Sequence, residues 1–283
     1  MKKITFCTLL CTLFTFGSCD MFSVDNYDEP AETLQGEVID IATGERILTD
    51  QGSEGIRVRL TELSWGDNVQ HNPDFYCMPD GTFQHTKLFK GTYNIRIDGP
   101  FIPLLREDGY GVPLADETIE KEISGVTKVR FEVEPFLKVV LVGEPTISNG
   151  KITAKVKVTR GVSKEIFKEK IEPLGKYNDS FVNMTDIQLF VSYSSTVGYR
   201  ARDDRWSNKI EYTGTDFEPL FGTEVTIKSN GTIPSGRTVF IRAAARINYA
   251  TESVRRWNYS EPMEVLIPVS YTHLRAHETS QDL

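Results

Sequence analysis

The sequence is poor in cysteine and histidine, the residues that most often carry nucleophilic or metal chemistry. Its 283 residues include four cysteines and four histidines. Three cysteines lie within the first 19 residues, which leaves Cys77 alone in the body of the chain. No disulfide can then form inside the folded part, so the fold must be held by packing. We interpret Cys77 as a buried structural residue, since a reactive thiol would need His71 or His85 beside it.

Catalytic sequence motifs are also missing. The chain contains no Gly-x-Ser-x-Gly elbow, no Walker loop and no His-Glu-x-x-His zinc motif. Asp67, His71 and Asp74 are close in sequence but match no metal-binding spacing. We therefore expect no enzyme, no metal site and no cofactor. The paired carboxylates of a glycosidase meet only in space, so the sequence leaves that alternative open.

Positive charge is scarce relative to negative charge. Lys and Arg total 32 against 40 Asp and Glu, which gives a formal net charge of −8. A nucleic-acid partner would need a basic face, and anionic lipid would need a basic cluster. We expect neither partner.

The single long apolar run stands at the start of the chain. Met1-Lys2-Lys3 precedes apolar residues 4–16, the layout of a secretory signal. A membrane-spanning helix would need about 20 apolar residues. Phe16-Gly17-Ser18-Cys19 resembles the lipobox of bacterial lipoproteins, in the form found in Bacteroidetes. The resemblance implies that residues 1–18 are removed and that lipid on Cys19 anchors the protein in the outer membrane; an ordinary signal-region cysteine is the alternative.

Residues 19–33 are polar and acidic, which indicates a flexible tether. Acidic residues soon after a lipidated cysteine resemble the Bacteroidetes signal for export to the cell surface. Here Asp20 is adjacent to the cysteine, while the other acidic residues begin at Asp25. We expect the cell surface in preference to the periplasmic face of the outer membrane.

Residues 34–134 alternate apolar and polar residues in short runs separated by turn signals, which predicts an antiparallel β-sandwich. Five motifs along it resemble those of the carboxypeptidase regulatory-like domain, whose fold is transthyretin-like: Gly36-x-Val38-x-Asp40, Thr43-Gly44-Glu45, Gly55-Ile56-x-Val58-x-Leu60, Asp80-Gly81-x-Phe83 and Gly91-Thr92-Tyr93. The resemblance implies a non-catalytic accessory module.

Residues 135–268 continue with strand patterns and resemble an immunoglobulin-like or fibronectin type III-like sandwich. Within them, residues 162–172 fit either a short helix or a charged edge strand. Residues 269–283 resemble translated adapter sequence more than native protein, and a genuine disordered tail is the alternative. The expected fold is therefore all-β, with two antiparallel β-sandwich domains.

The lipobox and the two sandwiches together resemble an uncharacterised family of two-domain Bacteroidetes lipoproteins. Its members are often encoded beside SusC/SusD-type glycan uptake systems. The resemblance implies a glycan-related role with SusC/SusD-type outer-membrane partners, by association only.

Sugar binding needs flat rings beside carboxylates, amides and arginines. We predict ligand contact at seven residues on loops: Tyr199, Arg202, Asp204, Trp206, Trp65, Tyr76 and Trp257. The alternative for each ring is core or hairpin packing. The expected function is that of a membrane-anchored, non-catalytic glycan-binding or accessory component of a polysaccharide uptake system. The alternative is a structural or adhesive module of a cell-surface assembly.

Overall fold

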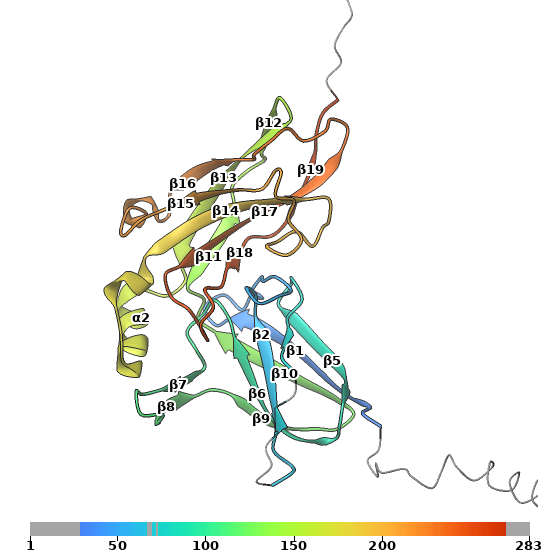
Figure 1. Ribbon diagram of the computed structural model, residues 1–283, viewed down its shortest axis with the longest axis vertical. Coiled ribbons are helices and arrows are strands. Elements are labelled where there is room, and N and C mark those ends of the chain that lie inside the picture. The colour runs from blue at the N-terminus through green and yellow to red at the C-terminus, as the bar shows by residue number, and fades with distance from the viewer. Residues whose placement is uncertain (1–28, 67–69, 72, 270–283) are drawn as a thin grey trace, which may run out of the picture.

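Strands dominate the molecule, and they form two β-sandwiches stacked end to end (Figure 1). The computed structural model describes residues 29–66, 70–71 and 73–269. Each sandwich has its own apolar core, one built between Leu34 and Val133 and the other chiefly between Phe136 and Ile267. The predicted all-β fold is confirmed. Among the described residues, no helix is long and apolar enough to cross a membrane.

The first sandwich consists of a three-stranded sheet, β10-β1-β5, and a five-stranded sheet in which β2 pairs with β3, β4 and β6, and β6 pairs with β9. A separate hairpin, β7-β8, completes it. The strands are β1 (Glu32–Asp40), β2 (Arg57–Glu62), β3 (Gln70–His71), β4 (Phe75–Tyr76), β5 (Thr82–Leu88), β6 (Gly91–Asp98), β7 (Leu105–Glu107), β8 (Pro113–Asp116), β9 (Ile119–Ile123) and β10 (Val126–Val133).

One strand pair departs from the expected antiparallel pattern. β10 pairs with β1 in parallel, with Gly36 opposite Val129 and Val38 opposite Phe131. Parallel strands need a long crossover connection. Here the chain between them builds the five-stranded sheet and the β7-β8 hairpin before it returns beside β1.

The alternation of the sequence determines which face of β1 is buried. Leu34 and Val38 are fully buried, whereas Gln35 and Glu37 point to the other face and remain partly exposed. Gly36 lies on the inner face directly under the ring of Phe83, whose Cζ atom would stand 2.1 Å from an added Cβ. A glycine is needed here because the ring occupies the space of a side chain.

The second sandwich pairs a four-stranded sheet, β11-β13-β12 with β16 on β13, with a five-stranded sheet, β15-β14-β17-β18 with β19 on β17. Its strands are β11 (Leu137–Leu141), β12 (Thr146–Ser148), β13 (Lys151–Arg160), β14 (Met184–Ser192), β15 (Asn208–Glu211), β16 (Glu224–Lys228), β17 (Thr238–Ile247), β18 (Asn258–Tyr259) and β19 (Met263–Leu266). Three short 3-10 helices connect them: η1 (Glu172–Leu174), η2 (Asp179–Val182) and η3 (Glu218–Leu220).

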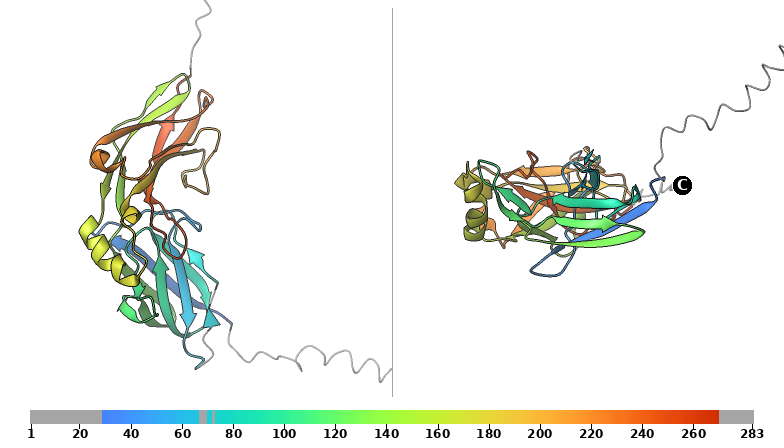
Figure 2. Two further views of the ribbon diagram at one scale, coloured as in Figure 1. Left: turned by 60° about the vertical axis from the view of Figure 1, so that its left-hand side comes forward. Right: turned by 90° about the horizontal axis from the view of Figure 1, so that it is seen from below.

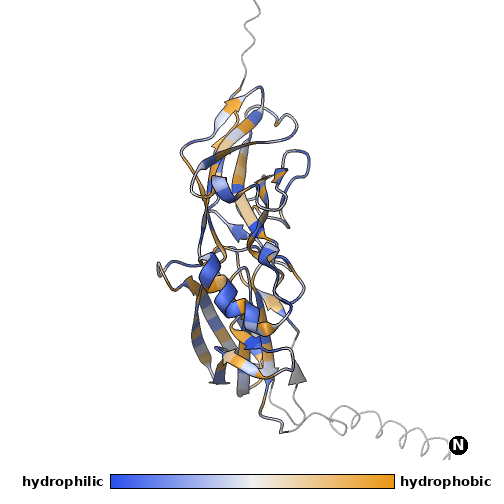
Figure 3. Cartoon of the chain, turned by 90° about the vertical axis from the view of Figure 1, so that its left-hand side faces the viewer, coloured by the Kyte–Doolittle hydropathy of each residue, from blue (hydrophilic) through white to orange (hydrophobic). Residues whose placement is uncertain are grey.

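The structure decides between the two alternatives for residues 162–172, because α2 (Lys164–Ile171) is a helix. The Ser163 hydroxyl accepts a hydrogen bond from the Ile166 N–H and caps its first turn. Phe167 and Ile171, one turn apart, are buried in the core of the second sandwich. The rest of the helix is mostly hydrophilic (Figure 3).

The two sandwiches are joined by buried hydrogen bonds. Arg242 on β17 is 2 % exposed and donates to the carbonyl oxygens of Thr49 (2.8 Å) and Pro79 (3.2 Å) in the first sandwich and of Ser260 (2.7 Å) in its own. Arg256 donates to the Ser53 carbonyl at 2.5 Å. The left view of Figure 2 shows the same end-to-end arrangement from a further side.

Candidate functional site

The loop between β14 and β15 contains four of the predicted ligand contacts, and its polar groups are already engaged with one another. The Arg202 guanidinium lies 4.3 Å from the ring centre of Tyr199, and its Nε donates to an Asp204 carboxylate oxygen at 2.6 Å. Tyr199 itself is half-buried and meets Phe190 edge to face. These contacts fix the loop and leave few groups for a ligand.

Trp206 and Trp257 are buried, so the prediction that their rings form an exposed sugar platform is wrong. Trp206 is 3 % exposed and packs in the core of the second sandwich, edge to face with Tyr193. Trp257 is fully buried near the joint between the sandwiches, beneath the guanidinium of Arg246. Both rings contribute core packing, as large aromatic residues commonly do in sandwiches.

Trp65 and Tyr76, the two predicted rings in the first sandwich, both reach the surface. Trp65 is 43 % exposed in the turn after β2. Tyr76 is half-buried on β4 and lines a groove of about 980 Å³, within the range of small-ligand sites. Tyr76 is thus the predicted residue that the structure places in a candidate binding site, and the groove does not include the other six.

The floor of this groove is the outer face of the three-stranded sheet. Strand register aligns its outward side chains in two rows, each crossing all three strands. The first row is Lys128, Gln35 and Gln84, and the second row is Arg130, Glu37 and Thr82. Residues two apart on a strand are separated by about 7 Å, and neighbouring strands by about 4.8 Å. The floor therefore presents a polar platform roughly 7 Å by 10 Å.

Several side chains of the floor have unused hydrogen-bonding capacity. Within the described part of the chain, the side chains of Gln35, Gln84 and Lys128 make no hydrogen bond or ion pair. Glu37 is engaged, because Arg46 donates to it at 3.1 Å. Amide groups can donate and accept at once, which suits the hydroxyls of a sugar. The free amides distinguish this groove from the loop at Tyr199.

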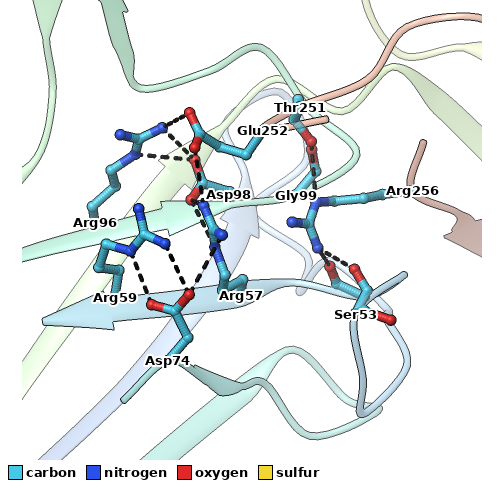
Figure 4. Close-up of polar contacts among 11 residues, drawn as sticks. Ser53, Arg57, Arg59, Asp74, Arg96, Asp98, Gly99, Thr251, Glu252 and Arg256 are labelled. Atoms are coloured by element: carbon cyan, nitrogen blue, oxygen red, sulfur yellow. Dashed lines mark hydrogen bonds and ion pairs between the residues drawn. The ribbon is translucent and has the colours of Figure 1, made fainter. Parts of the chain in front are cut away.

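The wall of the groove beside Tyr76 is rigidly held by ion pairs. Arg59 donates two hydrogen bonds of 2.9 Å to the Asp74 carboxylate (Figure 4). These bonds hold the pKa of Asp74 below its usual range. Arg57 lies 3.4 Å from the same carboxylate and 2.6 Å from Asp98, whose side chain is 3 % exposed. The wall is therefore part of a larger charged network.

The second sandwich supports this network from outside. Glu252 lies in the turn after β17 and accepts a hydrogen bond of 2.5 Å from Arg96. Its φ of 51° is uncommon for a residue other than glycine. Arg57 also approaches Glu252, at 3.4 Å (Figure 4). The second sandwich thereby helps to fix the arginines that orient Asp74.

Neither the Cys77 thiol nor the His85 imidazole is well placed for catalysis. Cys77 is fully buried, which raises the pKa of its thiol and keeps it protonated at neutral pH. Burial also lowers the pKa of His85, whose ring lies 5.3 Å from that of Phe75. In the described ranges, no group of three or more His, Cys, Asp or Glu side chains could hold a metal ion. Asp67 and Cys19 lie outside the described residues, as does most of the tail predicted to be non-native.

The floor of the groove was not predicted from the sequence. Gln35 and Glu37 were readable as outward positions of an alternating strand. Their alignment with Lys128 and Arg130 was not readable, because it depends on a parallel pairing between strands about 90 residues apart. No short motif marks such a row.

The fold and the groove define an all-β protein of two sandwiches with an open, polar groove on the first. Comparison with solved structures adds the family. A DUF3823 family protein from Bacteroides uniformis is 70 % identical, with a TM-score of 0.83, and the match covers 84 % of this chain and 100 % of that one. The chain belongs to the DUF3823 family.

More distant structures share the fold. A protein from Bacteroides uniformis, provisionally described as carbohydrate binding, is 18 % identical with a TM-score of 0.57. A DUF3823 family protein from Parabacteroides merdae is 15 % identical, also with a TM-score of 0.57. Each match covers 84 % of this chain and 100 % of the other. No family model and no curated protein sequence matches this chain.

Proposed function

We propose that this protein is a non-catalytic glycan-binding lipoprotein that holds polysaccharide at the outer membrane for an uptake system. The observation that carries the proposal is the groove over β10, β1 and β5, with two free glutamine amides and Tyr76 at its side. A half-exposed ring can pack against a sugar face while amides bind hydroxyls. Further support comes from the distant structural relative described as carbohydrate binding.

The proposed anchor is lipid on Cys19, supported by the lipobox Phe16-Gly17-Ser18-Cys19. The 12 residues between Cys19 and β1 could span at most about 45 Å. The described chain begins at the far end of the first sandwich (Figure 1), which would place the groove on the membrane-proximal domain. Protease shaving of intact cells tests the side of the membrane, and resistance until lysis would indicate the periplasmic face.

A glycan panel tests the binding function. Affinity electrophoresis and calorimetry should identify at least one polysaccharide that binds the chain lacking residues 1–19, with at least about tenfold weaker binding by Tyr76→Ala. Tyr110→Ala serves as the control, because Tyr110 is 95 % exposed and lies outside the groove. Absence of binding across the panel would refute the proposal.

The alternative, a structural module of a surface assembly, is favoured by one observation. The β7-β8 hairpin presents exposed apolar side chains at Tyr110 (95 %), Val112 (56 %) and Leu114 (49 %). Capture of an outer-membrane protein of the SusC/SusD type, lost when these three residues are replaced by Ser, would support a role in assembly. Retention of glycan binding by the same variant would show that the two roles are separate.

A further inference from the structure

We infer that the groove binds acidic polysaccharide, in which a sugar carries a carboxylate or a sulfate. This inference rests on the proposed glycan-binding function and specifies the ligand class. It follows from the cationic side of the groove floor, formed by Lys128 and Arg130 on β10.

Lys128 is an exposed lysine that has no partner within the described part of the chain. No ion pair or hydrogen bond of its side chain is present among residues 29–66, 70–71 and 73–269. It ends the row that continues through Gln35 and Gln84. An anionic sugar substituent at Lys128 would leave the ring hydroxyls over the two amides. The row therefore provides one cation followed by two neutral hydrogen-bonding groups.

Arg130 adds a second cation that is weakly engaged. Its side chain is 53 % exposed, and its nearest carboxylates are those of Glu132 at 3.8 Å and Glu37 at 4.0 Å. Both distances exceed a hydrogen bond, so the fork of guanidinium N–H groups remains available. Lys128 and Arg130 are two residues apart on one strand face, hence about 7 Å apart at their Cα atoms. Two cations at that spacing can meet successive charges along a polymer.

Most acidic groups near the floor are paired with arginines. Glu37 is held by Arg46, which also approaches Asp80 at 3.7 Å. Asp74 is held by Arg59, as described above. Glu132 is the exposed carboxylate closest to Arg130 on the same strand. The free charge facing the groove is therefore positive, although the whole chain carries −8.

The positive charge of the groove contrasts with the negative net charge of the whole chain. At physiological salt the Debye length is about 8 Å, so distant carboxylates are screened while groups in the groove act directly. A neutral sugar would need only Tyr76 and the amides. Lys128 and Arg130 add recognition for an anion, and their contribution should weaken as salt rises.

Matched pairs of polymers test the inference. Polygalacturonate is compared with its methyl ester, and dextran sulfate with dextran, so that each pair differs in charge on one backbone. We expect at least one acidic polymer to bind at least about tenfold more tightly than its neutral counterpart. The pair that responds distinguishes a carboxylate from a sulfate.

The variant Lys128→Gln/Arg130→Gln should remove that preference without altering the thermal melting curve, because both side chains are exposed. Lys121→Gln/Arg237→Gln removes the same charge from exposed positions outside the groove and should keep the preference.

Equal loss of the preference in the two variants would mean non-specific attraction and would overturn the inference. Equal binding of acidic and neutral polymers, or binding confined to neutral glycans of the panel, would overturn it and leave the glycan-binding function standing. Failure of every glycan would reject both.

Discussion

Tyr76, Trp206 and Trp257 are all aromatic residues for which ligand contact was predicted, yet their rings have different surroundings. Tyr76 lies on a short edge strand and reaches a groove, whereas the other two rings fill apolar cores. Composition predicts that aromatic rings matter here but not whether a ring binds a ligand or packs a core. That distinction depends on contacts between strands distant in sequence, which a local pattern does not contain.

The burial of Trp206 gives a prediction about stability. Trp206→Ala should lower the free energy of unfolding by about 3–5 kcal/mol, because it removes a large ring and leaves a cavity. Urea denaturation measures the loss. Tyr110→Ala, at a fully exposed ring, should change stability by less than about 0.5 kcal/mol. A loss below about 1 kcal/mol for Trp206→Ala would contradict the burial of this ring.

The ion pair of Asp74 gives a prediction about pH. Hydrogen bonds from Arg59 lower the pKa of Asp74 in the folded state, so the carboxylate stabilises the fold above its unfolded pKa. That contribution, up to roughly 1 kcal/mol, is lost as pH falls through the lowered folded pKa, below about 4. Asp74→Asn should therefore be less stable than the native protein at pH 7, and the difference should shrink as pH falls below about 4 and vanish below the lowered folded pKa. A difference that persists unchanged in acid would contradict the assignment.

At the scale of elements, the alternation of apolar and polar residues predicted most strands, because one face of each sheet is buried and the other is exposed to solvent. The strands β1, β2, β6, β13 and β17 were all visible as alternating or apolar runs. The sequence did not decide between a helix and a strand for α2. Only Phe167 and Ile171 form its buried face, and most of the other residues are charged. The parallel pairing of β1 with β10 was not predicted, because local sequence does not record which distant strand lies alongside.

Close packing beneath the groove gives a prediction for β1. Gly36→Val should lower stability by about 1–3 kcal/mol or more, because an added side chain meets the Phe83 ring. Phe83→Leu in the same protein should recover part of that loss, by making room. A double-mutant cycle in urea measures the coupling. Additive losses would show that the ring does not occupy this space.

At the scale of the whole molecule, a buried arginine joins the two sandwiches. Arg242 is desolvated, which lowers its pKa, and it donates to carbonyl groups of both sandwiches. The pair Arg57 and Arg96 makes a second connection through Glu252. Together with the hydrogen bond from Arg256 to Ser53, these connections should make the sandwiches unfold together and keep the groove wall oriented.

Arg242→Leu should uncouple the sandwiches. Carbonyl groups at Thr49, Pro79 and Ser260 would lose their donor, at a cost of about 2–5 kcal/mol in stability. Scanning calorimetry should then show two transitions where the native protein shows one. Arg237→Leu, at an exposed position in the second sandwich, should keep a single transition. A single transition in Arg242→Leu at an unchanged temperature would contradict this role.

The proposed function requires the outer face of the three-stranded sheet to bind glycan. The side-chain amide signals of Gln35 and Gln84 report on it directly in nuclear magnetic resonance spectra, because both groups face the groove. Titration with a polysaccharide identified by the panel should shift these two signals most, together with the backbone signals around Tyr76. Shifts concentrated in the loop at Tyr199 or elsewhere in the second sandwich, with both amide signals unchanged, would contradict glycan binding in this groove.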